Sequence, residues 1–162
     1  EKTKEPYLVP VDGSWSDLEI TGVKLTYFYE MLTNFPSQRV TVFLDACFSG
    51  RARNQGLVAA RGVKIVPKET QQAVKKKLIV FTASSGNQSS LPYTEKEHGL
   101  FTYFLIKKLD ETNGNITYEE LSNYLKEQVS IKSVMINGKE QSPQTNVSSE
   151  IGNEWQYWKF AE

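Results

Sequence analysis

Two short apolar runs stand out along the chain and predict two buried strands. They cover residues 39–45 and 77–83 and consist mainly of Val, Leu, Ile and Phe. Nearly continuous apolar runs of this length are typical of strands whose two faces are both covered, as in a parallel sheet. We therefore expect two buried strands of a mainly parallel sheet.

A helix is predicted before the first of these strands. Its apolar face has a spacing of three or four residues and is formed by Leu25, Phe28, Leu32 and Phe35. Pro36 predicts the end of this helix, because the residue before a proline is disfavoured in helical conformation. Residues 1–22 contain two prolines and two glycines and are expected to be irregular.

Two further helices are expected after the second strand. The first follows Gly99, and its apolar face is formed by Leu100, Phe101, Phe104, Leu105 and Leu109. Thr117, followed three residues later by Glu120, has the form of a capping box and predicts the start of the second. We expect a separate apolar stretch at residues 134–136 and a turn at residues 137–138. Trp155 and Trp158 are expected to cover the edge of the core.

The order of the elements predicts the fold class. A helix, a strand, a long loop over residues 49–72, a strand and two helices follow one another. This order favours an α/β sandwich with a mainly parallel sheet. At 162 residues the chain is long enough for one domain with a hydrophobic core, and we expect residues 1–162 to form one.

Composition narrows the function classes. The formal net charge is zero, which argues against a protein that binds nucleic acid or an anionic membrane. No apolar run reaches the roughly 18 residues that a membrane span needs. No cluster of His and Cys favours zinc, and no acidic cluster favours calcium, so we expect no metal and no cofactor. The chain starts at Glu1 without a signal-peptide pattern. We expect a processed or excised piece of a cytoplasmic protein.

The single cysteine follows the first predicted strand, in Asp45-Ala-Cys47-Phe-Ser-Gly50. A lone cysteine is either a small buried residue or a candidate nucleophile. In open α/β sheets, ligands bind beyond the carboxyl ends of the strands. The position of Cys47 after this strand therefore supports the nucleophile interpretation, and the interpretation as a small buried residue stays open.

Residues 42–50, Val-Phe-Leu-Asp-Ala-Cys-Phe-Ser-Gly, resemble the nucleophile strand of caspase-like cysteine peptidases, which include caspases, metacaspases and bacterial relatives. Segments 5–10, 81–89 and 98–103 resemble further segments of this family in the family's order. The resemblance extends from about residue 5 to about residue 150. It implies a caspase-like three-layer α/β/α sandwich with a mainly parallel central sheet, incomplete at its N-terminal side.

The resemblance also implies roles for individual residues. Cys47 would attack the peptide bond as a thiolate, and its backbone N–H would stabilise the developing oxyanion. In metacaspases, the acid that matches Asp45 lies in the pocket for the substrate's P1 side chain, where it would select Arg or Lys. The alternative for Asp45 is a cap or turn residue at the strand end. The residues that match the family's substrate loop are Ser84, Ser85, Asn87, Gln88 and Ser89, and their alternative is an ordinary polar turn.

The family's catalytic His-Gly precedes the segment that matches the start of this chain. The only histidine, His98, is followed by Gly99, but it comes after the cysteine and opens a helix, so we do not expect it to be the base. We expect residues 1–162 alone to be inactive, and an upstream segment or a second chain to supply the histidine. The expected partner is a peptide or protein substrate.

Three interpretations remain open, and the first is a cysteine endopeptidase that prefers a basic P1 residue. The loop from Arg51 to Lys77 carries basic residues. An enzyme of this kind would therefore have cleavage sites in its own loop, and Arg61, which Gly62 follows, is the best candidate for self-cleavage. The second is a catalytically silent caspase-like interaction module. The third is an α/β domain with a redox cysteine, which the absence of a second cysteine disfavours.

Overall fold

The centre of the protein is a three-stranded sheet, seen in a computed structural model that describes residues 6–46, 77–85 and 88–161. Its strands are β3 (Val40–Leu44), β4 (Leu78–Thr82) and β7 (Gln144–Val147), in the order β3-β4-β7. β3 and β4 are parallel, with Val40 opposite Leu78 and Leu44 opposite Thr82. The two strands predicted from the apolar runs are confirmed to within one residue at each end.

The third strand makes the described sheet mixed instead of mainly parallel. β7 pairs antiparallel with β4, and Gln144 lies opposite Thr82. Two helices, α3 (Leu100–Thr112) and α4 (Tyr118–Asn137), connect β4 to β7. The second helix returns the chain to the carboxyl end of β4, so the next strand must run in the opposite direction. The α/β class is confirmed, but a mainly parallel sheet is not.

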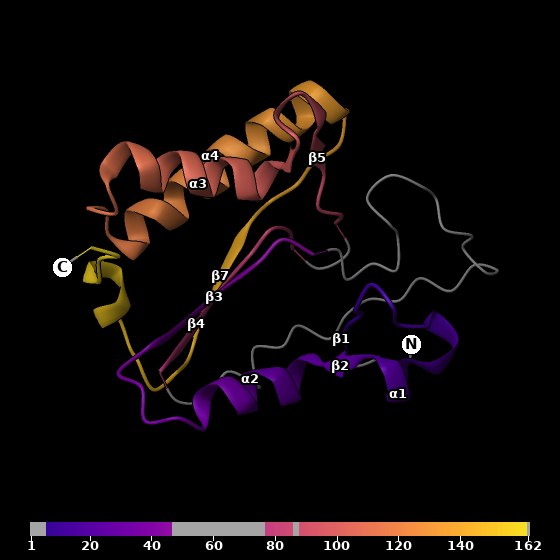
Figure 1. The fold of residues 1–162 in the computed structure, drawn as a ribbon. Helices are drawn as coiled ribbons and strands as arrows, with labels where there is room; N and C mark the ends of the chain where they lie inside the picture. Colours follow the sequence, from indigo (N-terminus) through magenta and orange to yellow (C-terminus); the bar gives the residue numbers. More distant parts are fainter. Residues whose placement is uncertain (1–5, 47–76, 86–87, 162) are drawn as a thin grey trace.

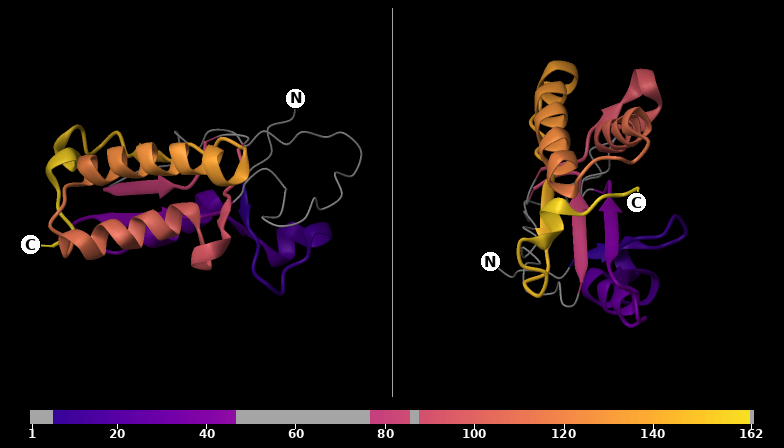
Figure 2. Two further views of the ribbon diagram at one scale, coloured as in Figure 1. Left: turned by 90° about the horizontal axis from the view of Figure 1, so that it is seen from above. Right: turned by 90° about the vertical axis from the view of Figure 1, so that its left-hand side faces the viewer.

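Helices cover both faces of this sheet (Figures 1 and 2). Successive side chains of a strand point to opposite faces. In β4, Leu78 and Val80 pack toward α2 (Leu25–Thr33), whereas Ile79 and Phe81 pack toward α3 and α4. All four side chains are buried. The continuous apolar run that predicted this strand therefore reflects two separate cores, one on each face.

The capping box at the start of α4 is confirmed. The Thr117 side chain accepts a hydrogen bond from the backbone N–H of Glu120 at 3.2 Å, and the Thr117 N–H donates to the Glu120 carboxylate at 2.9 Å. These hydrogen bonds with Thr117 hold the pKa of the Glu120 carboxyl below its usual value. Because this pKa is lowered, the contribution of the contact to stability is lost as the pH falls through it.

The end of α4 differs from the sequence prediction. Residues 134–136, expected as a separate stretch, form the last turn of the helix, and their side chains are exposed. Gly138 adopts a left-handed conformation with φ of 60° and ends the helix. The turn predicted at residues 137–138 is therefore a helix C-cap. Trp155 and Trp158 pack against the core as predicted.

Residues 1–22, which were expected to be irregular, contain the short elements β1 (Tyr7–Leu8) and α1 (Leu18–Thr21). β1 pairs with β2 (Val23–Lys24), which follows them. A hairpin of β5 (Pro92–Tyr93) and β6 (His98–Gly99) precedes α3. A single-turn 3-10 helix, Glu154–Tyr157, follows β7. The loop expected over residues 49–72 lies outside the described residues. Among the described helices, none combines the length and the apolar character needed to cross a membrane.

Candidate functional site

The carboxyl ends of β3 and β4 lie at the same edge of the sheet because the two strands are parallel. The backbone N–H of Ala83 donates to the carbonyl of Leu44 at 2.8 Å, which extends the pairing one residue beyond the end of β4. Asp45 and Ala46 therefore emerge next to the start of the segment 84–90. This edge brings together the residues before Cys47 and most of the predicted substrate loop. Cys47, Asn87 and Arg61 themselves lie outside the described residues.

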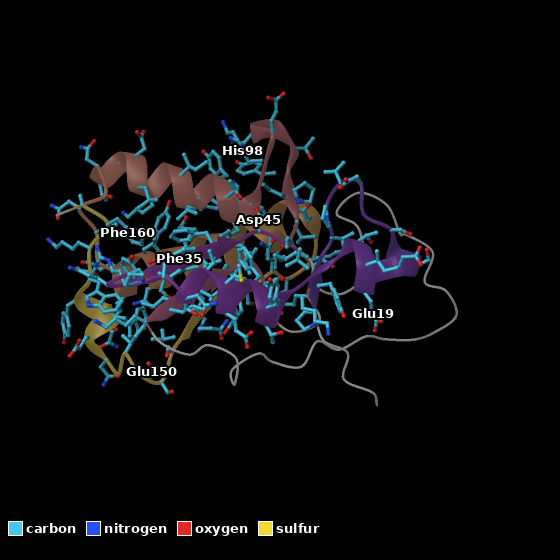
Figure 3. All side chains as sticks on the ribbon, turned by 60° about the horizontal axis from the view of Figure 1, so that its bottom comes forward. Glu19, Phe35, Asp45, His98, Glu150 and Phe160 are labelled. Carbon is cyan, nitrogen blue, oxygen red and sulfur yellow. The ribbon has the colours of Figure 1, made fainter. Side chains whose placement is uncertain are left out.

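Asp45 is held by the first turn of α3. One carboxylate oxygen of Asp45 accepts a hydrogen bond from the Thr102 hydroxyl at 2.6 Å and one from the Thr102 backbone N–H at 3.3 Å. The first N–H groups of a helix have no partner within the helix and favour negative charge. Gly99, the N-cap residue of α3, has no side chain to accept hydrogen bonds from the first turn. Asp45, which follows β3, accepts them instead. Figure 3 labels Asp45 and His98 in the fold.

A buried serine fixes the residue that precedes Cys47. The Ser90 side chain is fully buried, and its hydroxyl donates to the carbonyl of Ala46 at 3.1 Å. Ser90 is the last residue of the segment 84–90, so the contact joins the far end of that segment to the chain just before Cys47. Ala46, just before Cys47, is therefore held by the segment 84–90 as well as by its connection to β3.

Three predicted residues of the substrate loop, Ser84, Ser85 and Gln88, are joined by hydrogen bonds. The Gln88 side-chain oxygen accepts hydrogen bonds from the Ser85 hydroxyl at 3.0 Å and from the backbone N–H of Ser142 at 2.8 Å. The backbone N–H of Gln88 donates to the carbonyl of Ser85 at 2.9 Å, and the Ser84 hydroxyl donates to the carbonyl of Gln88 at 3.4 Å. Ser89 is half-buried beside them. Ser84, Ser85 and Gln88 are thus brought together, next to the connection between α4 and β7.

Ser90, Thr102 and Gln141 lie at this edge and were not singled out from the sequence. Thr102 belongs to the segment 98–103, which carried a family resemblance, but nothing in its spacing indicated a contact with Asp45. The fully buried Gln141 lies between the exposed Glu140 and the half-buried Ser142. A glutamine in a polar stretch gives no signal of burial, so only the three-dimensional structure identifies it.

His98 lies apart from the sheet edge, on the β5–β6 hairpin. It is exposed and pairs with Tyr93 across the two short strands. His98 therefore lies just before the start of α3, as expected. Among the residues that the structure describes, no group of three or more His, Cys, Asp or Glu side chains is placed to hold a metal ion.

The site thus contains the Asp45 carboxylate and a polar segment with Ser84, Ser85 and Gln88 at the carboxyl ends of β3 and β4. A half-buried carboxylate can bind a basic side chain, and the backbone of a polar segment can pair with an extended peptide. Comparison with protein families gives a match to the model of the caspase domain over residues 1–151. No curated protein matches the chain.

The contact between Asp45 and Thr102 predicts a measurable loss of stability. Thr102→Val removes the hydroxyl donor and keeps the shape, whereas Thr102→Ser keeps the donor. Hydrogen bonds to charged groups contribute about 1.5–3 kcal/mol, and because Asp45 is only half-buried we expect a loss of about 1–2 kcal/mol for Thr102→Val. Urea denaturation measures this free energy of unfolding. Equal losses in the Val and Ser variants would show that the hydroxyl contact does not contribute.

Proposed function

Because the chain belongs to the caspase-domain family, a family of cysteine peptidases, we propose that it acts as a cysteine endopeptidase with Cys47 as the nucleophile. The observation that supports this most directly is the anchoring of the two residues before Cys47. Thr102 holds Asp45, and Ser90 holds Ala46, at the carboxyl end of β3. A nucleophile that follows such a fixed backbone starts from a defined position relative to the substrate segment.

In the proposed reaction, the Cys47 thiolate forms a bond to the carbonyl carbon of the scissile peptide. The backbone N–H of Cys47 donates to the oxyanion that develops. The C–N bond then breaks, and the leaving amine takes a proton from a histidine that acts as general acid. Water, deprotonated by the same histidine, hydrolyses the thioester and releases the second product. The thiolate is regenerated, so the net reaction consumes one water molecule.

We assign the general base to a histidine outside residues 1–162. His98, the only histidine of the sequence, is exposed in β6, just before the start of α3. The residues that act together in such a mechanism lose most of their effect when one is absent. Residues 1–162 alone are therefore expected to cleave peptides poorly, and a segment or second chain that carries the histidine is expected to restore cleavage.

Asp45 is proposed to select Arg or Lys at P1. Its carboxylate accepts two hydrogen bonds from Thr102 and carries the negative charge that a basic P1 side chain requires. The Thr102 contacts fix the orientation of the carboxylate before the substrate arrives. Ser84, Ser85, Asn87, Gln88 and Ser89 are proposed to line the path of an extended peptide. Together these residues would bind a basic side chain and the peptide that carries it.

Replacement of the nucleophile should abolish cleavage. In the complete protein, with the histidine-bearing part present, we expect Cys47→Ala to lower kcat by at least about 1,000-fold, because the loss of one member disables the whole catalytic unit. A fluorogenic peptide assay measures the rate, and near-ultraviolet circular dichroism checks that the fold is intact. Undiminished cleavage by the folded variant would rule out Cys47 as the nucleophile. If the unsubstituted complete protein cleaves no peptide, a catalytically silent interaction module is the better description.

The P1 preference should depend on the charge of Asp45. Asp45→Asn keeps an oxygen that accepts from Thr102 but removes the charge, so it separates selection from capping. A panel of substrates that differ only at P1 should show Arg and Lys well above Asp. In Asp45→Asn the advantage of Arg over a neutral residue should fall about 10- to 100-fold, the equivalent of one charge-assisted contact. A preference for Asp, or an unchanged ranking in the variant, would refute this pocket.

Self-cleavage is proposed between Arg51 and Lys77, with Arg61 as the first candidate because Gly62 follows it. An enzyme that selects basic P1 residues carries such sites in its own chain. Mass spectrometry of the complete active protein should find a new terminus in this range. The terminus should be absent in Cys47→Ala, and Arg61→Gln should remove it if Arg61 is the site. An intact chain in a fully active sample would show that activity does not require this cleavage.

A further inference from the structure

A single buried side chain closes the segment that carries the candidate substrate residues. Gln141 is fully buried in the connection between α4 and β7. Its amide nitrogen donates to the carbonyl of Ala83 at 2.9 Å, just before the segment 84–90. Its amide oxygen accepts from the backbone N–H of Leu91 at 2.8 Å, just after that segment. The two ends of the segment are thus joined through one side chain.

The two backbone groups held by Gln141 lie beyond the regular pairing of the sheet. β4 ends at Thr82, and its partner β7 begins opposite that residue. The carbonyl of Ala83 is therefore the first one past the ladder, and the Gln141 amide takes the place of the next strand. An amide is suited to this because it carries both a donor and an acceptor. An apolar side chain of the same size would leave both backbone groups without their partner.

Gln141 is itself attached to α4. Its backbone N–H donates to the Ser133 hydroxyl at 3.0 Å, and that hydroxyl donates to the carbonyl of Ser130 at 2.9 Å. Ser133 is fully buried on the face of α4 that packs on the core. The position of the amide is therefore fixed by the helix and not by the connection alone.

The neighbouring residue holds the middle of the same segment. The backbone N–H of Ser142 donates to the Gln88 side-chain oxygen at 2.8 Å. At its far end, the segment is joined through Ser90 to the carbonyl of Ala46, the residue before Cys47. Hydrogen bonds from α4 to Gln141, from Leu91 to Gln141 and from the adjacent Ser90 to Ala46 therefore connect α4 with the end of β3.

We propose that Gln141 is a positioning residue for substrate binding. By binding Ala83 and Leu91, it holds the described residues 84–85 and 88–90 beside the end of β3 without touching the substrate. This inference rests on the proposed function, because it assumes that the segment pairs with an extended peptide. Loss of Gln141 should then weaken binding of long substrates more than the chemistry at the scissile bond, since the catalytic groups do not contact Gln141.

The test compares Gln141→Met with Gln144→Met in the complete protein. Methionine matches glutamine in length but cannot replace its hydrogen bonds, and Gln144 is an exposed residue three positions on, at the start of β7. With a peptide that has four residues before the scissile bond, we expect Gln141→Met to raise KM by at least about tenfold. With a substrate of a single arginine, kcat/KM should change by less than about threefold. Gln144→Met should alter neither.

Equal losses with both substrates, or no loss with the long one, would overturn the positioning role. If Gln141→Met does not fold, Ser133→Ala removes only the hydroxyl that holds the Gln141 backbone and should give a smaller change in the same direction. A readout independent of activity is hydrogen exchange at the Leu91 amide, which should become at least about tenfold faster in Gln141→Met only. Unchanged protection of Leu91 would refute the contact. Absence of Cys47-dependent cleavage in the unsubstituted protein would instead refute the proposed function.

Discussion

The parallel pairing of β3 with β4 is the constraint on which the rest of the structure depends. Both strands are apolar on both faces, so each face must be covered, and α2 covers one while α3 and α4 cover the other. Parallel strands also end at the same edge, because their carboxyl ends point the same way. The chain before Cys47 and the segment 84–90 therefore leave the sheet side by side, before any side chain at the site contributes.

Beyond the last paired residues, hydrogen bonds replace apolar packing as the means of holding the chain. Asp45 is fixed by Thr102, Ala46 by Ser90, and the ends of the segment 84–90 by Gln141. Such polar contacts are directional, so they define position more sharply than apolar packing does. A peptidase needs a precise geometry at this edge and not merely a stable one. Asp45 caps α3, and in the proposed function the same carboxylate also binds the basic side chain of the substrate.

The sequence predicted the features that have a local cause. The strands at residues 39–45 and 77–83 follow from apolar runs, and the capping box at Thr117 follows from a spacing of three residues; the structure confirms both. The antiparallel direction of β7 depends on two helices returning the chain to the same edge, which no local pattern records. The Gln141 side chain binds the backbone of Ala83 and Leu91, which are more than 40 residues away in the chain, so no local pattern predicts its burial. The candidate roles of Cys47 and Asp45 came from the family resemblance, and the match to the caspase domain confirms the family but does not test those roles.

The central claim is that Cys47 is a nucleophile beside a pocket that selects a basic side chain. A peptidyl ketone with an arginine next to the reactive carbon labels such a cysteine covalently, and mass spectrometry locates the adduct. In the complete protein, we expect one adduct at Cys47, formed much faster with the arginine reagent than with the same reagent ending in aspartate. No adduct at Cys47, or faster labelling by the aspartate reagent, would contradict the account.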